Sequence, residues 1–138
     1  MRTYLDTNVV IAYIDEGEPL HEEVSRAIDG VRDRVVSRLV LLELSTVYSR
    51  AGFGDSTSLA FYSIELIGAE LIETDFNNVI GYALRLSPII RLKTLDLLHI
   101  SFCLQNNIGR LLTLDKDILD KRDAVKRLGL EVISPIQL

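Results

Sequence analysis

The sequence predicts an α/β fold in which a mainly parallel β-sheet carries helices on both faces. Short apolar runs rich in β-branched residues alternate along the chain with longer segments whose apolar residues recur at helical spacing. Strands that alternate with helices form β-α-β units, whose helical crossovers pack against the sheet. The 138 residues are 48% hydrophobic and 25% charged, which is typical of a globular chain with its own core.

Five segments have the length and composition of strands, and they lie at residues 2–5, 34–37, 70–74, 110–114 and 130–134. Helices are expected between them, at residues 8–14, about 19–30, 39–51, 56–67, 75–87 and 95–107, with a short stretch after residue 115. Boundary residues support these limits. Asp55 and Thr94 are typical helix caps, Pro19 suits a first turn, and Gly109 suits a helix end.

The chain is expected to form one domain over residues 1–138, because no repeat, low-complexity tract or linker interrupts the pattern. It has no run of about eighteen apolar residues, and its N-terminus lacks the cleavage site of a secretory signal. Cys103 is the single cysteine, which favours the reducing cytoplasm. The net charge of −5 argues against a protein that coats nucleic acid, but not against a nuclease whose carboxylates bind cations.

Two carboxylates stand where this fold class usually binds ligands. Asp6 follows strand 2–5, and Asp115 follows strand 110–114. In open parallel sheets, ligands bind outside the carboxyl ends of the strands. Asp6 also has a simpler interpretation, as the cap of the next helix. Asp117 is interpreted as the cap of the helix after Asp115, or as an additional metal ligand.

Two further acids, Glu43 and Asp96, are predicted to lie on helices. Glu43 shares a face with apolar residues, and a buried carboxylate is costly unless it is paired or bound to metal. The competing interpretations are an ion pair with Arg38 or Arg50, or a helix that is less buried than its apolar residues suggest. Asp96 falls in the first turn of its helix, where the helix dipole favours an acid without any further role.

His99 lies three residues after Asp96, so the two side chains can share a helix face. It is interpreted either as a metal ligand or, in preference, as an imidazole at the edge of the core that bonds to the backbone. Cys103 is assigned to packing. The sequence contains no nucleophile elbow, glycine-rich phosphate loop or zinc-type cysteine and histidine spacing.

Four short acidic motifs follow one another along the chain: YLDTN (4–8), LLELS (41–45), LDLLH (95–99) and TLDKD (113–117). In this order they resemble the PIN domain family, and within it the small VapC-type toxin ribonucleases, over essentially the whole chain. The resemblance implies a three-layer fold around a five-stranded parallel sheet. It also implies that four catalytic acids converge at the carboxyl edge: Asp6, Glu43, Asp96 and Asp115. Asn8 and Thr113 would orient them.

The function that follows from this resemblance is a metal-dependent endoribonuclease, the toxin of a type II toxin–antitoxin pair. Mg²⁺ or Mn²⁺ would be held by Asp6, Asp96 and Asp115, with Glu43 as a ligand or acting through water. The implied partners are RNA, an antitoxin protein and a second copy of the chain, with no membrane. Asp6→Asn or Asp96→Asn is expected to abolish cleavage and leave the fold intact.

Two alternatives stay open at this point. One is an RNA-processing nuclease of the same fold without an antitoxin, and the other is a non-catalytic RNA-binding or assembly subunit. A phosphohydrolase of the haloacid dehalogenase type fits less well, because Asn8 stands where its second acid is needed. Four basic residues flank the acids and are candidates for phosphate contacts: Arg38, Arg91, Lys93 and Lys116.

Overall fold

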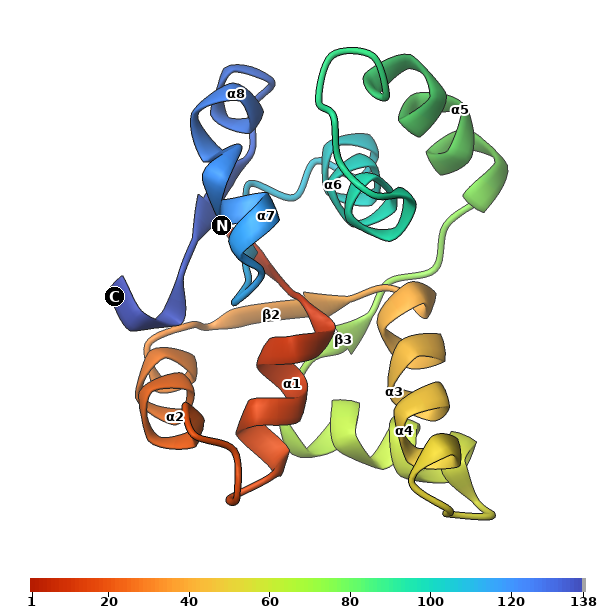
Figure 1. Cartoon of the computed structure of the whole chain (residues 1–138), viewed down its shortest axis with the longest axis vertical. Helices are drawn as coiled ribbons and strands as arrows, with labels where there is room; N and C mark the ends of the chain where they lie inside the picture. Colours follow the sequence, from red (N-terminus) through yellow and green to blue (C-terminus); the bar gives the residue numbers. More distant parts are fainter. Residues whose placement is uncertain (138) are drawn as a thin grey trace.

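The computed structural model describes residues 1–137 and contains a sheet of five strands (Figure 1). The strands are β1 (Arg2–Leu5), β2 (Asp33–Val36), β3 (Glu70–Leu71), β4 (Arg110–Leu112) and β5 (Glu131–Ile133). They lie in the order β3-β2-β1-β4-β5, and every neighbouring pair is parallel. The predicted α/β class and five-stranded parallel sheet are confirmed.

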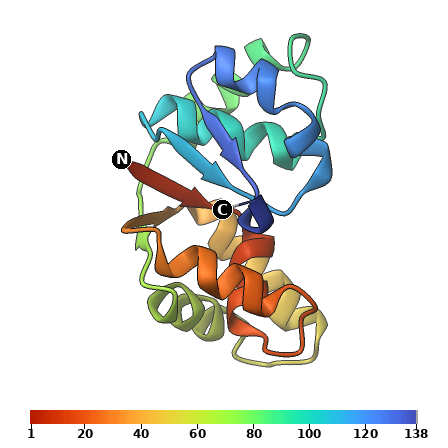
Figure 2. The same ribbon diagram turned by 90° about the vertical axis from the view of Figure 1, so that its left-hand side faces the viewer.

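Helices cover both faces of this sheet. They are α1 (Thr7–Ile14), α2 (His21–Asp29), α3 (Arg38–Arg50), α4 (Ser56–Leu66), α5 (Phe76–Leu86), α6 (Thr94–Gln105), α7 (Lys116–Asp120) and α8 (Arg122–Arg127), with a 3-10 turn η1 (Pro135–Gln137). Figure 2 shows α1 to α4 on one side of the strands and α5 to α8 on the other. The three predicted layers are therefore present. Every helix within residues 1–137 is too short or too polar to cross a membrane.

The strand order creates a switch point between β1 and β4. The chain first steps outward from β1 to β2 and β3, and it then returns past β1 to β4 and β5. Because such crossovers are right-handed, the two halves place their helices on opposite faces. The crevice left at the carboxyl ends of the two central strands is where α/β proteins bind ligands. The residues that follow Leu5 and Leu112 are therefore the first candidates for a site.

Three predicted helix ends differ from the structure by one or two residues. α2 begins at His21 and not at Pro19, because residues 16–20 form a turn that precedes it. α6 begins at Thr94, so Lys93 is its N-cap residue, and its side chain makes no capping hydrogen bond. The left-handed residue after α6 is Asn107, with a φ of 56°, and not Gly109. Asparagine tolerates this conformation better than other side chains do.

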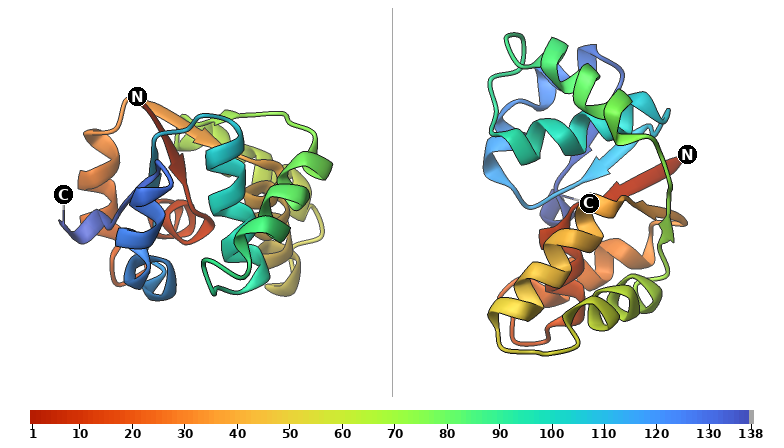
Figure 3. Two further views of the ribbon diagram at one scale, coloured as in Figure 1. Left: turned by 90° about the horizontal axis from the view of Figure 1, so that it is seen from above. Right: turned by 90° about the vertical axis from the view of Figure 1, so that its right-hand side faces the viewer.

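β3 is much shorter than predicted. Only Glu70 and Leu71 pair with β2, although the Ile72 N–H also donates to the Val36 carbonyl at 2.9 Å. As an edge strand, β3 has a partner on one side only. The chain then leaves the sheet along its edge toward α5 on the opposite face, as the right-hand view of Figure 3 shows.

An aromatic group links the central strand to one helical layer. The Tyr4 ring of β1 lies 5.4 Å from the Phe102 ring of α6, and Phe102 stacks on Phe76 of α5 at 5.9 Å. Tyr4, Phe102 and Cys103 are fully buried. The packing role assigned to Cys103 is confirmed. The anchoring of α6 by β1 also decides where the next side chain on that helix face, His99, can reach.

Arg34 on β2 is expected to contribute strongly to stability. Its guanidinium donates to the carbonyls of Ile28, Val31 and Ile67 at 2.8, 2.8 and 2.7 Å, which ties the ends of α2 and α4 to the sheet. Cations near helix C-termini also favour the helix dipole. Arg34→Met keeps the length of the side chain but leaves three carbonyls unpaired, and should lower the free energy of unfolding by about 2–3 kcal/mol. Urea unfolding would measure the loss.

The control for this prediction is Arg32→Met. Arg32 is exposed and lies two residues earlier in the chain, so the same change of charge should alter stability by less than about 0.5 kcal/mol. Equal losses in the two variants would contradict the proposed role of Arg34.

Ser101 on α6 is expected to be a stabilising site for alanine. Its side chain is fully buried, and its hydroxyl has no hydrogen-bond partner among residues 1–137. A buried hydroxyl without a partner costs about 1–3 kcal/mol. Ser101→Ala should therefore raise the free energy of unfolding by about 1 kcal/mol, since alanine also favours the helix. A measured loss of stability in thermal unfolding would contradict this.

Candidate functional site

Asp6 is held at the junction of β1 and α1 by two hydrogen bonds. Its Oδ1 accepts from the Thr7 N–H at 2.8 Å, and its Oδ2 accepts from the Thr113 hydroxyl at 2.6 Å. The Asp6 N–H donates to the Leu112 carbonyl and so continues the β1–β4 ladder. Asp6 is only 6% exposed. It is both the cap of α1 and an acid facing the switch point, so the two interpretations of its position are compatible.

Thr113 and Asn8 connect the loops that follow β1 and β4. The Thr113 hydroxyl, which donates to Asp6, also accepts from the Asp115 N–H at 3.0 Å. The Asn8 side-chain carbonyl accepts from the Leu114 N–H at 3.1 Å. The two residues therefore position the loop that carries Asp115, as expected of orienting groups.

Glu43 lies in a different environment from the one predicted. The apolar neighbours on its face of α3 are exposed, with Leu42 at 63% and Val47 at 42%, and the Glu43 side chain itself is 28% exposed. Its partner is neither Arg38 nor Arg50. Glu43 Oε1 instead accepts from His99 Nε2 at 2.6 Å and from the Thr7 hydroxyl at 2.8 Å. The prediction of a deeply buried acid was wrong, because the buried side of α3 is the one that carries Val40 and Leu44.

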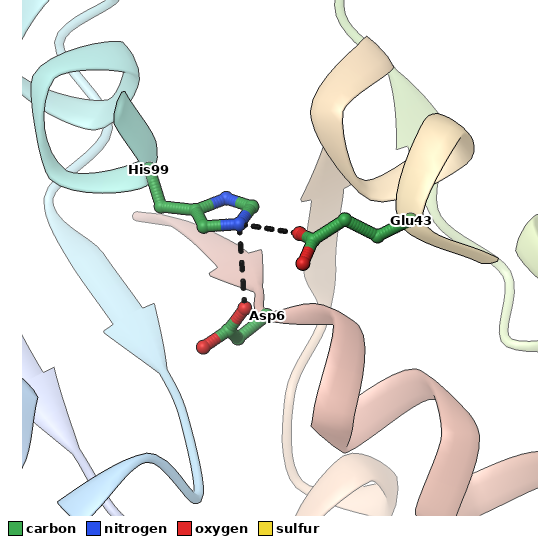
Figure 4. Close-up of side chains that lie close together, drawn as sticks. All are labelled: Asp6, Glu43 and His99. Carbon is green, nitrogen blue, oxygen red and sulfur yellow. Dashed lines mark hydrogen bonds and ion pairs between the residues drawn. The ribbon is translucent and has the colours of Figure 1, made fainter. Parts of the chain in front are cut away.

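His99 connects the acids from α6. It is 2% exposed, and its Nε2 lies 2.6 Å from Glu43 and 3.7 Å from Asp6 Oδ1 (Figure 4). Its other ring nitrogen, Nδ1, lies 2.6 Å from the Tyr4 hydroxyl. The preferred interpretation of a bond to the backbone is therefore wrong, because both ring nitrogens bond to side chains. The three-residue spacing from Asp96 was the only sequence signal that pointed to the site.

Glu43 and His99 shift each other's pKa. Burial by itself would raise the pKa of Glu43, but the hydrogen bond and charge of His99 and the Thr7 hydroxyl outweigh it, so the pKa is lowered. Burial would lower the pKa of His99, but the Glu43 hydrogen bond and the charge of Asp6 raise it. Each partner therefore stabilises the charged form of the other.

Asp96 lies against other carboxylates. It is 9% exposed in the first turn of α6. Burial, followed by the nearby charges of Asp115 and Asp6, raises the pKa of Asp96 to about 6. Asp115 caps α7, because its Oδ1 accepts from the Asp117 N–H at 2.8 Å. The assignment of the cap to Asp117 was therefore wrong. The Asp117 carboxylate instead lies close to those of Asp96 and Asp115.

All four predicted acids line one cleft of about 730 Å³ at the switch point. It is bounded by the starts of α1 and α6 and by one side of α3. Of the basic candidates, only Lys93 lines it, joined by Arg50, which was not among them. Arg38 pairs with Glu73 on the surface instead, and Arg91 lies over a neighbouring hollow.

The side chains in the cleft suit a divalent cation. Two groups each offer ligand atoms within 4.8 Å of one another: Asp6, Glu43 and His99, and Asp96, Asp115 and Asp117. Carboxylate oxygens are the ligands that Mg²⁺ and Mn²⁺ prefer. The crowding that raises the pKa of Asp96 is also what a bound cation would relieve. The donor chemistry therefore fits a hard metal.

The fold and the site together define an α/β protein with a cluster of acids at the carboxyl ends of its two central strands. The PIN domain family profile matches residues 3–124, which is most of the chain. The chain belongs to the PIN domain family, whose members are metal-dependent nucleases. The family resemblance carried by the four motifs is confirmed. No curated protein sequence is similar enough to count as a relative.

Solved structures share the fold over nearly their whole length. The structure of VapBC2 from Rickettsia felis bound to a fragment of its promoter DNA matches with a TM-score of 0.68, 20% identity and coverage of 97% of this chain and 98% of that one. FitAcB from Neisseria gonorrhoeae matches with a TM-score of 0.67, 15% identity and 99% coverage of both. VapC20 from Mycobacterium tuberculosis, described as a sarcin-ricin loop cleaving toxin, matches with a TM-score of 0.68, 16% identity and coverage of 86% and 93%.

Proposed function

We propose that this protein is a metal-dependent endoribonuclease and the toxin of a type II toxin–antitoxin pair. The observation that carries the proposal is the convergence of four carboxylates, from distant parts of the chain, in one cleft at the switch point. Carboxylates are not crowded in this way without an energetic cost, as the raised pKa of Asp96 indicates. A site that accepts this cost is typical of cation-assisted phosphate chemistry.

In this proposal Asp6, Asp96 and Asp115 hold Mg²⁺ or Mn²⁺, and Glu43 acts as a ligand or through water. The chemistry that the cation would supply is Lewis acidity and neutralisation of the charge that develops on the scissile phosphate. The chain itself fixes the acids in advance, since Asp6 is held through Thr7 and Thr113. Fixed ligands avoid reorganisation when substrate arrives.

The same cleft offers groups that bind the RNA backbone. Lys93 and Arg50 both line it, Arg50 from the end of α3 and Lys93 from the position just before α6. Cations at these positions neutralise substrate phosphates, which matters in a chain of net charge −5. Lys93 directly precedes α6, the helix that carries Asp96. Phosphate binding by Lys93 would therefore bring the RNA close to the acid cluster.

The proposed partners are an antitoxin protein and a second copy of the chain, in the cytoplasm. The antitoxin is supported by three similar structures: a toxin-antitoxin complex from Klebsiella pneumoniae, VapBC2 from Rickettsia felis on its promoter DNA, and FitAB bound to a DNA fragment. The homodimer is supported by an apolar hollow on α5 and α6, where Ile80 is 48% and Leu84 is 71% exposed. Light scattering of the purified chain tests the dimer.

Incubation of the pure protein with mixed RNAs tests the proposed activity. We expect internal cleavage in Mn²⁺ or Mg²⁺, none in EDTA, and recovery when metal is added back. Asp6→Asn should be inactive under all conditions, while Asp120→Asn, which changes an exposed acid of α7, should keep its activity. RNA binding without cleavage would favour a non-catalytic subunit instead. Cleavage that survives EDTA and Asp6→Asn would reflect a contaminating nuclease.

A further inference from the structure

A network of hydrogen bonds between buried polar side chains ends at Glu43. The Ser37 hydroxyl lies 2.7 Å from the Tyr4 hydroxyl, which lies 2.6 Å from His99 Nδ1, and His99 Nε2 lies 2.6 Å from Glu43. Ser37 and Tyr4 are fully buried, while His99 and Glu43 both line the cleft, and Glu43 is the more exposed of the two. The network links β1, the start of α3 and α6 to the Glu43 carboxylate.

The donors and acceptors of this hydrogen-bond network can be assigned from its two end members, Glu43 and Ser37. Glu43 Oε1 already accepts from the Thr7 hydroxyl, and a carboxylate oxygen only accepts, so His99 Nε2 carries a proton and donates. At the other end the Ser37 hydroxyl caps α3 by accepting from the Leu39 N–H. If His99 is neutral, Ser37 donates to Tyr4 and Tyr4 donates to Nδ1. If it is charged, Nδ1 donates to Tyr4, whose hydroxyl turns to Ser37. His99 therefore presents an N–H to Glu43 in either state.

Glu43 needs such support more than the other acids do. It projects from the exposed side of α3 between exposed apolar residues, and its longer side chain has more rotamers than an aspartate. Asp6 is fixed by a backbone N–H and the buried Thr113. Among residues 1–137, Glu43 has only side-chain partners, Thr7 and His99, and both bond the same oxygen, Oε1. Its other oxygen, Oε2, is left available for the cleft.

We propose that His99 is a positioning residue, locked by Tyr4 and Ser37, that holds Glu43 by one oxygen and turns the other toward the metal and substrate. The inference rests on the proposed function, because Glu43 is placed in the catalytic cleft. His99 is accordingly not a ligand of the cation. The distance of 3.7 Å from its Nε2 to Asp6 is too long for a second hydrogen bond, so Glu43 is the partner that fixes the ring.

The variants His99→Gln and His99→Leu distinguish the hydrogen bond that His99 donates to Glu43 from the contribution of its side chain to packing. The amide of His99→Gln can donate to Glu43 as Nε2 does, whereas His99→Leu keeps a buried apolar volume and loses the donor. Partners that orient metal ligands usually change metal affinity by about 10–100-fold when removed. We expect His99→Leu to weaken Mn²⁺ binding about tenfold and His99→Gln to restore it to within about threefold of the native chain.

Electron paramagnetic resonance of free Mn²⁺ during a titration measures this affinity without any substrate. His21→Leu is the matched control, since the other histidine lies on α2 and bonds the Ala12 carbonyl away from the cleft. It should leave Mn²⁺ affinity unchanged. In a Glu43→Gln background, His99→Leu should add less than about a twofold effect, because its action passes through Glu43. Tyr4→Phe should weaken Mn²⁺ binding in the same direction by a smaller factor, with thermal unfolding used to check that each variant folds.

The outcomes separate the two proposals. If the native chain binds Mn²⁺ and cleaves RNA but His99→Leu does both equally well, the positioning role is overturned and the function stands. A full effect of His99→Leu in the Glu43→Gln background would also overturn it. Nitrogen hyperfine coupling from an imidazole bound directly to Mn²⁺ would make His99 a ligand instead. A native chain that neither binds Mn²⁺ nor cleaves RNA would overturn both.

Discussion

Asp96→Asn is expected to abolish RNA cleavage and, in the absence of metal, to make the protein more stable. The loss of activity should be roughly a thousandfold or more, since the variant removes a proposed metal ligand. The gain in stability follows from the raised pKa of Asp96, which shows that burial and the charges of Asp115 and Asp6 disfavour its carboxylate. An amide at this position has no charge to repel.

The pH dependence gives the sign and the size of this gain. The pKa of Asp96 is about 6 in the folded chain and 3.8 ordinarily, so between these values the folded state binds more protons than the unfolded state. The native chain therefore loses stability as pH rises through this window, by up to about 3 kcal/mol. The pKa shift is the net result of all interactions of this charge, including the favourable dipole at the start of α6. Asp96→Asn should therefore be more stable than the native chain by up to about 3 kcal/mol above pH 6.

Thermal unfolding in EDTA at several pH values measures this prediction. The two chains should have similar stability near pH 4 and diverge up to pH 6. Added Mn²⁺ should then stabilise the native chain and have little effect on Asp96→Asn. Asp120→Asn, which changes an exposed acid of α7, is the control and should follow the native chain throughout. A destabilised Asp96→Asn at pH 7 without metal would mean that the carboxylate has a favourable partner.

Much of the fold was predictable because it depends on local patterns. Apolar runs and helical spacing mark the strands and helices, and alternation of the two implies parallel pairing. The errors lie at the ends of elements, where neighbours decide. Residues 72–74 have strand composition, but an edge strand pairs only as far as β2 extends beside it. Asn107, and not Gly109, makes the left-handed turn because the helix ends earlier than the glycine predicts.

The acids of the site could be predicted from the sequence, but the side chains that hold Glu43 in place could not. Asp6 and Asp115 follow strands, and sheet geometry by itself brings the ends of adjacent strands together. The bond from Tyr4 to His99 spans 95 residues of sequence, and no periodicity links the two. The environment of Glu43 was misjudged for a similar reason. Apolar residues on two sides of α3 do not reveal which side packs against the sheet, and Leu42 and Val47 lie on the exposed one.

The second large effect is expected for Thr113→Val, a change that removes one hydroxyl and keeps the shape. Thr113 is fully buried, donates to Asp6 Oδ2 at 2.6 Å and accepts from the Asp115 N–H at 3.0 Å. Valine leaves both partners unpaired and lets Asp6 rotate about the bond to the Thr7 N–H. RNA cleavage should fall by about 10–100-fold at limiting metal, and stability by about 2 kcal/mol.

Titrations of cleavage rate against Mn²⁺ test this effect, with Thr113→Ser as the matched control. Serine keeps the hydroxyl and loses only a buried methyl group, so it should retain most activity while costing about 1 kcal/mol of stability. Because Thr113→Ser and Thr113→Val both disturb the core, a difference between them in Mn²⁺ dependence isolates the hydrogen bond. Equal activity of both variants at every Mn²⁺ concentration would mean that the Thr7 N–H by itself orients Asp6, and that the loop after β4 contributes only Asp115.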